Sequence, residues 1–338
     1  MQTTSKNNPT IRDVAKLADV SVATVSRVIN QNTPVSPDVE ERVRNAMQEL
    51  RYFPKAAARN LSNQKTNTIG FILEDMNGDF MGPMLSGIET SIQENQYQLL
   101  IASTRYSLGQ EGFPLPLGPH NTDGLLVFTN CIPDDRLLEL YEMEFPMVLI
   151  HRTPPEHMPI PSVTIENKQA TEEIVSHLIT AHQRKRIVLL RGPQAEEDSH
   201  WREQGFMEAH RKHGLPVYDE LLVQGDFYRD TAYQSICQLI EKGIEFDGVF
   251  SGDDEAAVGV LKAFHQYNIR CPEDASLAGF DDQNIASCIT PQLTTVYAPT
   301  EEVGRVAADQ LFKLINGEQA DPLTLLRTQM ILRESCGC

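Results

Sequence analysis

The sequence lacks the features that mark membrane-spanning and secreted proteins. No stretch approaches about 18 consecutive apolar residues, and the first nine residues lack the apolar core of a signal peptide. The six cysteines include no Cys-x-x-Cys pair, so reduced thiols are expected in place of a disulfide framework. These absences predict a cytoplasmic protein without a membrane partner.

Motifs that carry catalysis are also missing. The sequence contains no Gly-x-Ser-x-Gly, no His-Glu-x-x-His, no P-loop and no glycine-rich dinucleotide turn. His177 and His182 are five residues apart, a spacing that does not suit a pair of metal ligands on one helix, and both are expected at the surface. We therefore expect no enzymatic activity, no metal site and no cofactor.

Positive charge is scarce in the whole chain and concentrated near its start. The 338 residues contain 29 Lys and Arg against 47 Asp and Glu, a net charge of −18. Residues 1–61 hold nine basic and six acidic side chains, a net of about +3, so the rest of the chain carries about −21. Because phosphates attract the first part and repel the second, this distribution predicts a small DNA-binding head on an acidic body of one or two further domains.

The head begins with two short helical patterns. Thr10 is a suitable N-cap for a helix over residues 11–17, and Ser21 caps a second helix whose apolar residues recur at helical spacing. A connection of about three residues, Ala18-Asp19-Val20, joins the two helices. This arrangement predicts a helix-turn-helix, although an ordinary helical hairpin gives the same pattern.

The second helix carries residues suited to the major groove of DNA. Val22, Ala23 and Arg27 are expected to face outward, while Val25 and Val28 face inward. Arginine can bind guanine O6 and N7 together, and small apolar side chains can contact a thymine methyl group. The exposed face therefore favours base reading over simple packing.

A third helix and a short basic segment complete the head. The Ser36-Pro37 start predicts a helix that runs to Leu50 and closes a small core. Residues 55–61 contain good helix formers but are too few to be stably helical alone. They either fold on DNA, with Leu61 wedged between base steps in the minor groove, or serve as a plain linker.

Several of these segments resemble the lactose-repressor/galactose-repressor family of bacterial transcription regulators. The resemblance implies a homodimer on a pseudo-palindromic double-stranded operator, with a DNA-binding domain over residues 1–65 and a hinge helix near 54–63. The matching segments are Thr10-Ile11-Arg12-Asp13-Val14-Ala15, residues 20–30, Val35-Ser36 and Ala58-Arg59-Asn60-Leu61. The residues expected to contact DNA are Thr10, Ser21, Val22, Ala23, Thr24, Ser26, Arg27, Asn30, Ala58, Arg59 and Leu61.

The body alternates short apolar runs with helical patterns. Such alternation predicts parallel sheets with a ligand in the crevice outside the strand ends. The expected strands lie near residues 69–73, 98–102, 124–128, 147–150, 187–191, 248–250 and 275–279. The expected helices lie near residues 83–95, 170–181, 201–213, 230–242 and 254–267.

The body also resembles the same family, in its periplasmic-binding-protein-like effector domain of two Rossmann-like subdomains. The matching residues include 250–259, Gly279-Phe280-Asp281-Asp282 and 291–296. The resemblance implies three crossings between the subdomains. We expect one subdomain to contain residues 66–160 and 296–325 and the other to contain residues 161–295 and 326–338.

A sugar-sized ligand needs carboxylates and a guanidinium for its hydroxyl groups and an aromatic ring for its apolar side. By position in the family pattern, Arg202 and Asp281 are the first candidates, although Arg202 can instead pair with Asp198 and Asp281 can cap a loop. The abundance of acids disfavours charged anionic ligands. The effector-binding residues expected are Asp75, Phe80, Asp198, Arg202, Phe227, Asp253 and Asp281.

Two departures from the family pattern leave the effector open. Asp253 stands where Asn is common, and Gly78-Asp79 precedes Phe80 where Asn-Pro is common. Three prolines and two glycines in residues 110–119 predict a loop where a helix would be expected, unless the sequence is corrupted there.

We expect a repressor of a carbohydrate-utilisation operon, induced by a neutral sugar. A protein partner or a nucleoside or purine ligand is the alternative. A dimer is favoured over a tetramer, because no leucine-heptad tail follows Arg333.

Overall fold

The computed structural model describes residues 9–30, 34–52, 65–74, 79–104 and 114–338. The chain divides into two compact units, residues 1–66 and 67–338, called here the head and the body. Each is considered by itself. Within the described ranges, no helix is long and apolar enough to cross a membrane.

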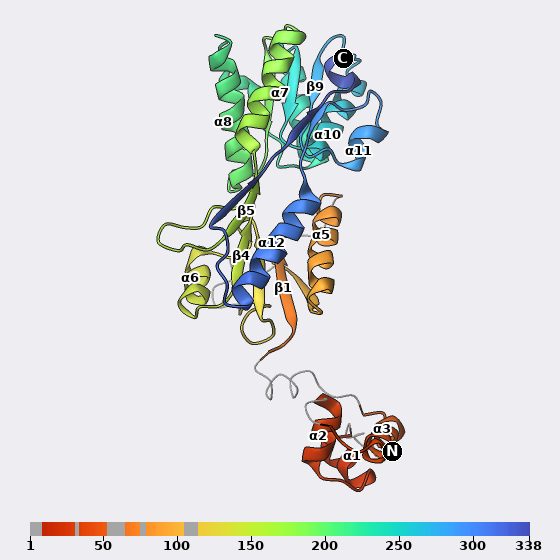
Figure 1. Ribbon diagram of the computed structural model, residues 1–338. Helices are drawn as coiled ribbons and strands as arrows, with labels where there is room; N and C mark the ends of the chain where they lie inside the picture. The colour runs from red at the N-terminus through yellow and green to blue at the C-terminus, as the bar shows by residue number, and fades with distance from the viewer. Residues whose placement is uncertain (1–8, 31–33, 53–64, 75–78, 105–113) are drawn as a thin grey trace. The chain divides into compact units, whose positions relative to one another are not determined.

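The head contains the three predicted helices (Figure 1). Helix α1 spans Ile11–Leu17, α2 spans Val22–Asn30 and α3 spans Pro37–Leu50. The Thr10 amide and hydroxyl both donate to Asp13 Oδ2, at 2.8 and 2.7 Å, and so fix the start of α1. The Oγ of Ser21 accepts from the Thr24 amide at 3.1 Å at the start of α2.

A small apolar core holds these helices together. Asp19 adopts φ 52° in the turn between α1 and α2, a conformation that aspartate tolerates better than most residues. The Arg42 guanidinium donates to the carbonyl of Ala18 at 3.2 Å, which connects α3 to the same turn. The buried core residues are Val14, Ala15, Ala18, Val25, Val28, Val43 and Ala46.

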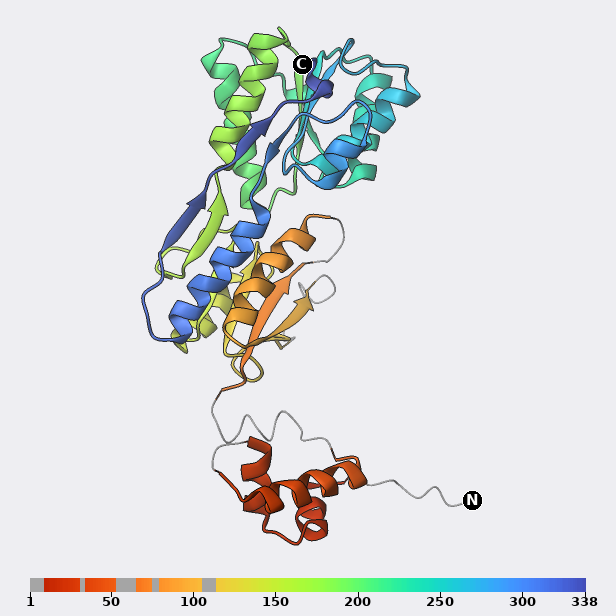
Figure 2. The same cartoon turned by 45° about the vertical axis from the view of Figure 1, so that its right-hand side comes forward.

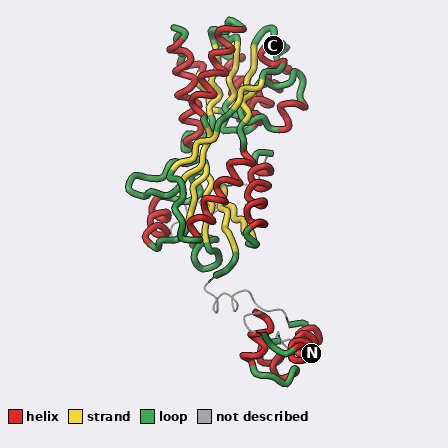
Figure 3. Tube along the Cα trace, in the orientation of Figure 1, coloured by secondary structure: helices red, strands yellow, loops and turns green. Residues whose placement is uncertain are grey.

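The first subdomain of the body is a six-stranded sheet in the order β11-β5-β4-β3-β1-β2, with every pair parallel. Figure 3 shows helices beside these strands. Its strands are β1 (Thr68–Leu73), β2 (Gln98–Ser103), β3 (Gly124–Phe128), β4 (Met147–Ile150), β5 (Ser162–Ile165) and β11 (Leu323–Leu326). Its helices are α5 (Met81–Glu94), α6 (Asp134–Glu142) and α12 (Thr300–Ile315).

The second subdomain is a four-stranded parallel sheet in the order β7-β6-β8-β9. Its strands are β6 (Ile187–Arg191), β7 (Leu222–Gln224), β8 (Gly248–Ser251) and β9 (Ser276–Ala278). Its helices are α7 (Asn167–Ala181), α8 (Glu197–Lys212), α9 (Arg229–Glu241), α10 (Asp254–Gln266) and α11 (Asn284–Cys288), with 3-10 turns η1 (Asp219–Leu221) and η2 (Glu334–Cys336).

Three segments connect the two subdomains. The chain leaves the first sheet after β5, returns between β10 (Thr295–Tyr297) and α12, and leaves again between β11 and β12 (Gln329–Ile331). Strands β10 and β12 pair in antiparallel fashion. The first crossing therefore follows Ile165 and not residue 160 as expected, because β5 pairs with β4 and β11 in the first sheet.

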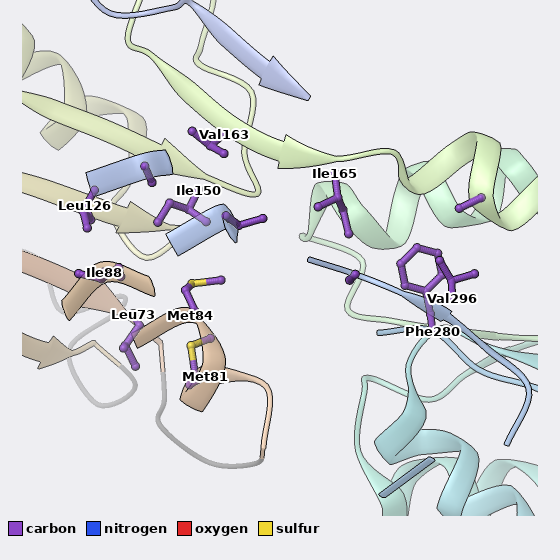
Figure 4. Packing of buried hydrophobic residues seen from close by; sticks show 14 of the residues in the cluster. Leu73, Met81, Met84, Ile88, Leu126, Ile150, Val163, Ile165, Phe280 and Val296 are labelled. Atoms are coloured by element: carbon purple, nitrogen blue, oxygen red, sulfur yellow. The ribbon is translucent and has the colours of Figure 1, made fainter. Parts of the chain in front are cut away.

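The loop predicted at 110–119 is confirmed where the structure describes it. Residues 114–119 form bends and turns and no helix, and Leu117 packs into the first subdomain. Apolar side chains from both subdomains form one large buried cluster. Figure 4 shows Ile150 and Met84 of the first subdomain and Ile165, Phe280 and Val296 near the crossings.

Helices α5 and α12 lie side by side against the first sheet (Figure 2). A Cβ placed on Gly87 of α5 would lie 1.9 Å from the backbone oxygen of Glu301 in α12. The two helices can therefore come this close only because position 87 has no side chain. By contrast, a Cβ on Gly82, in the first turn of α5, would meet nothing within 4 Å.

We predict that Gly87→Ala destabilises the body by about 1–3 kcal/mol, because backbone atoms must move apart to admit the methyl group. Urea unfolding followed by circular dichroism measures the change. Gly82→Ala in the same helix is the matched control and is expected to be neutral or slightly stabilising. Equal effects of the two substitutions would contradict the close approach.

Candidate functional site

The outer face of α2 carries the predicted base-reading residues. Val22 is 42% exposed, and Ala23 and Arg27 are exposed as well. Val25 and Val28 are buried in the head core, so the predicted orientation of this helix is confirmed. The face combines a guanidinium with two small apolar side chains, which suits the edges of base pairs in a major groove.

The other predicted DNA contacts have different surroundings. Thr10 is exposed and hydrogen-bonded to Asp13. Ser21 caps α2, and its hydroxyl lies 2.8 Å from that of Thr24. Thr24 and Ser26 are half-buried. The side chain of Asn30 and the predicted positions Ala58, Arg59, Leu61 and, in the body, Asp75 lie outside the described residues.

The body contains a cavity of about 430 Å³ between its two subdomains, called here the cleft. It lies beyond the carboxyl ends of strands in both parallel sheets, where ligands of such folds bind. Of the seven predicted effector-binding residues, the structure brings together six. The six that line the cleft are Phe80, Asp198, Arg202, Phe227, Asp253 and Asp281.

The guanidinium of Arg202 is the central polar group of the cleft, and it is 4% exposed. Its Nε donates to Asn167 Oδ1 at 2.9 Å, Nη1 donates to the Gly252 carbonyl, and Nη2 donates to Asp281 Oδ1 at 3.3 Å. Its Cζ also lies 3.8 Å from the centroid of the Phe280 ring. These contacts, from α7 and from the residues that follow β8 and β9, hold the guanidinium in one orientation.

Asp198 lies beside Arg202 and has its own supports. Its Oδ2 is 2.8 Å from His151 Nδ1 and 3.8 Å from Arg202 Nη2, and its Oδ1 accepts from Asn167 Nδ2 at 2.7 Å. Burial alone would raise the pKa of Asp198, but His151, Arg202 and the Asn167 hydrogen bond hold this pKa below its usual value. These contacts favour the ionised form of Asp198 in the cleft.

Three other acids of the cleft, Asp253, Glu196 and Asp281, shift in the opposite direction. Burial and the nearby charge of Asp281 raise the pKa of Asp253 to about 8. Burial, with the charges of Asp198 and Glu74, raises the pKa of Glu196 to about 7. Burial also raises the pKa of Asp281, although the charge of Arg202 opposes this shift. The cleft thus combines an ionised carboxylate with carboxyl groups that retain protons near neutral pH.

Phe227 supplies the aromatic surface of the second subdomain. A Cβ on Gly192 would lie 2.0 Å from Phe227 Cζ, so the ring lies directly over the backbone at that position. Asp226 and Phe227 adopt φ 54° and 59°, a conformation that costs non-glycine residues free energy and that clusters at binding sites. Phe80 and Phe128 face the cleft from the first subdomain, with ring centroids 6.1 Å apart.

The prediction missed several residues of the cleft. Glu74 and Thr129 follow the first-sheet strands β1 and β3, and Pro193 and Glu196 follow β6. Their position after strands was visible in the sequence, since parallel strands end at a common edge. The remaining residues that the prediction missed are Asp79, Met81, Phe128, Asp226, Tyr228, Glu255 and Gln283.

Two family models match this chain. The model described as bacterial regulatory proteins, lacI family, matches residues 10–55, which contain the helices of the head. The model described as a periplasmic binding protein-like domain matches residues 175–336, most of which belong to the second subdomain.

Relatives and solved structures agree with these matches. Catabolite control protein A of Priestia megaterium is 33% identical over 317 residues, which cover 93% of this chain and 95% of that protein. A transcriptional regulator CelR–cellobiose complex has a TM-score of 0.71 and 28% identity, covering 97% of this chain and 99% of that chain.

The lac repressor dimer bound to operator and the anti-inducer ONPF has a TM-score of 0.80 and 23% identity, covering 98% of this chain and 99% of that chain. At 23% identity, the similarity to the lac repressor shows a shared fold. Together, the family matches, the relative and the structures agree over both the head and the body. The chain therefore belongs to the LacI family of bacterial regulatory proteins, with a helix-turn-helix DNA-binding domain and a periplasmic-binding-protein-like body.

Proposed function

We propose that this regulator represses a carbohydrate-utilisation operon and that a neutral, hydroxyl-rich sugar in the cleft changes its affinity for operator DNA. The observation that carries this proposal is the fixed guanidinium of Arg202 beside the ionised Asp198, with the Phe227 ring lining the same cavity. A guanidinium and a carboxylate bind vicinal hydroxyl groups, and an aromatic ring covers the apolar face of a pyranose. Cellobiose in the related CelR complex is a ligand of this type.

The charge of the cleft supports a neutral ligand. Its described lining contains eight carboxyl side chains and one guanidinium. Phosphate or carboxylate groups would be repelled by this excess of acids, whereas hydroxyl groups donate hydrogen bonds to them. The protonated carboxyl of Asp253 adds a donor, since its pKa lies at about 8.

We infer that the protein acts as a homodimer and that the sugar is an inducer. In this mechanism, ligand closes the cleft, the subdomains of the dimer rotate, and the hinge segments around Leu61 separate from the centre of the operator. The sugar must bind the low-affinity state more tightly by a few kcal/mol for this coupling to work. The dimer on operator in the related lac repressor structure supports the assembly.

The first prediction concerns the effector. In a thermal-shift panel of neutral mono- and disaccharides, nucleosides and sugar phosphates, we expect one neutral sugar to raise the melting temperature. A ligand at a hundred times its Kd adds about 2.7 kcal/mol to the free energy of unfolding. The same sugar should weaken operator binding in a gel-shift titration.

Arg202→Lys keeps the charge but loses the planar fork, so we expect roughly ten- to hundred-fold weaker sugar binding with operator binding retained. Arg211→Lys, an exposed position on the same helix α8, is the control and should bind the sugar normally.

In the thermal-shift panel, a rise in melting temperature with a sugar phosphate or nucleoside alone, or no rise with any compound, would count against a neutral sugar. Either result would favour another ligand or a protein partner.

The second prediction concerns base reading. Arg27→Ala should cost about 1–3 kcal/mol on an operator selected from random DNA and much less on unselected DNA. Arg44→Ala removes the same charge from α3, where Arg44 pairs with Glu40, and is the control. Fluorescence anisotropy at one fixed salt concentration compares the affinities. Equal losses on both DNAs would refute base reading by Arg27.

The third prediction concerns protons in the cleft. Asp253 retains its proton in the folded state up to about pH 8, whereas an unfolded aspartate loses it near about pH 4. Its contribution to stability is complete below about pH 4 and is lost as the pH rises towards about 8. The melting temperature should therefore fall between about pH 4 and pH 8 because of this group.

Asp253→Asn should reduce this slope, because asparagine does not titrate and can still accept from the Ala256 amide, as Asp253 does at 2.9 Å. Part of the slope should remain, because Glu196 shifts in the same direction. Asp230→Asn, an exposed position on α9, is the control. An unchanged slope in Asp253→Asn would show that Asp253 does not hold its proton in this range.

A further inference from the structure

Four side chains with metal-ligating atoms meet in the second subdomain, away from the cleft. His177 lies in the last turns of α7 and His182 follows that helix, while Cys336 and Cys338 come from the last residues of the sequence. The four donor atoms all lie within 4.8 Å of one another. None of these residues lines the cleft.

The separations between the ligand atoms are close to those of a tetrahedral site. His177 Nε2 is 3.2 Å from His182 Nε2, and Cys338 Sγ is 3.4 Å from each of them. Cys336 Sγ is 3.9 Å from His177 Nε2. Around a tetrahedral zinc ion, with Zn–N of about 2.0–2.1 Å and Zn–S of about 2.3 Å, ligand atoms lie about 3.3 Å apart for two nitrogens and about 3.6 Å apart for nitrogen and sulfur.

The sequence predicted that a spacing of five residues does not suit two metal ligands on one helix, and the structure does not place both residues on one helix, because α7 ends at Ala181, between them. Both residues are half-buried, whereas we expected them at the surface. His182 is no longer helical and turns its ring towards His177, with the ring centroids 4.9 Å apart. The two Nε2 atoms therefore point at one place.

The backbone that carries the two cysteines is held in position by other contacts. Ser335 Oγ donates to the Leu277 carbonyl at 2.7 Å and accepts from the Thr294 amide at 2.8 Å, and Ser276 Oγ donates to the Cys336 carbonyl at 2.7 Å. Gly337 has φ 109°, a conformation open to glycine, and it turns the chain so that Cys338 also reaches the histidines. The ligand set is thus arranged by the fold itself.

The chemical types of the four ligands indicate which metal they would bind. Two thiols and two imidazoles at tetrahedral separation favour zinc over magnesium or calcium, which prefer oxygen ligands.

We propose that His177, His182, Cys336 and Cys338 bind one zinc ion. On binding, both thiols release their protons to solvent, and the two thiolates neutralise the charge of the ion. The four Zn–ligand bonds then tie the segment around Cys336 to the end of α7. This site is separate from the proposed sugar site and does not depend on it.

The test uses the reduced full-length chain without a histidine tag. After incubation with Zn²⁺ and removal of excess metal, elemental analysis should give one zinc per chain. Co²⁺ in its place should give the strong visible bands of tetrahedral coordination and a thiolate-to-cobalt charge-transfer band. Zn²⁺ should also raise the melting temperature and protect Cys336 and Cys338 from alkylation, as peptide mass spectrometry reports.

Cys338→Ser and His182→Gln should each lose the cobalt bands and most of the bound zinc. Cys338 is exposed and His182 is half-buried, and the melting temperature without metal checks that both variants fold. Cys288→Ser and His265→Gln, at exposed positions outside the cluster, are the controls and should bind as the parent does. Equal zinc binding in Cys338→Ser and the parent, an octahedral cobalt spectrum, or no bound zinc would overturn the proposal.

Discussion

The ion pairing of one buried guanidinium, that of Arg202, underlies the organisation of the cleft. The Arg202 guanidinium donates hydrogen bonds to Asn167 and to the carbonyl of Gly252. It also lies close to the carboxyl groups of Asp198 and Asp281. Burying a carboxylate without a nearby cation costs free energy, so the number of ionised carboxylates that the cleft can hold depends on Arg202. The protons retained by Asp253 and Glu196 follow from that limit, because one cation does not neutralise all the surrounding acids.

The local pattern of the sequence was enough to predict the head. Its helices are amphipathic and directly follow Thr10, Ser21 and Ser36, and capping residues act over three or four positions. The strands of the body that form long apolar runs were also predicted. Helices α6 and α12 and the short strands β5, β7 and β10–β12 were not predicted. These strands have only three or four residues each, so their sequence pattern is weak and their pairing depends on tertiary contacts.

We predicted the cleft residues mainly from the resemblance of the sequence to the LacI family. The residues that this prediction missed show which information such a resemblance does not contain. Glu74 and Glu196 belong to the cleft because two sheets end facing one another, which is a property of the assembled body. The His177–Cys336 cluster was missed for a similar reason. Its two histidines are more than 150 positions from its two cysteines, and the four residues meet only after the last segment has returned to α7.

The three crossings between the subdomains also determine when the body can fold during synthesis. Strand β11, residues 323–326, completes the first sheet beside β5, and α12 packs on α5, so the first subdomain is finished only when nearly all of the chain has left the ribosome. Until then the apolar face of α5 lacks its partner α12. Contacts of such long sequence separation form slowly, so this protein should be exposed to aggregation during synthesis and should benefit from chaperones.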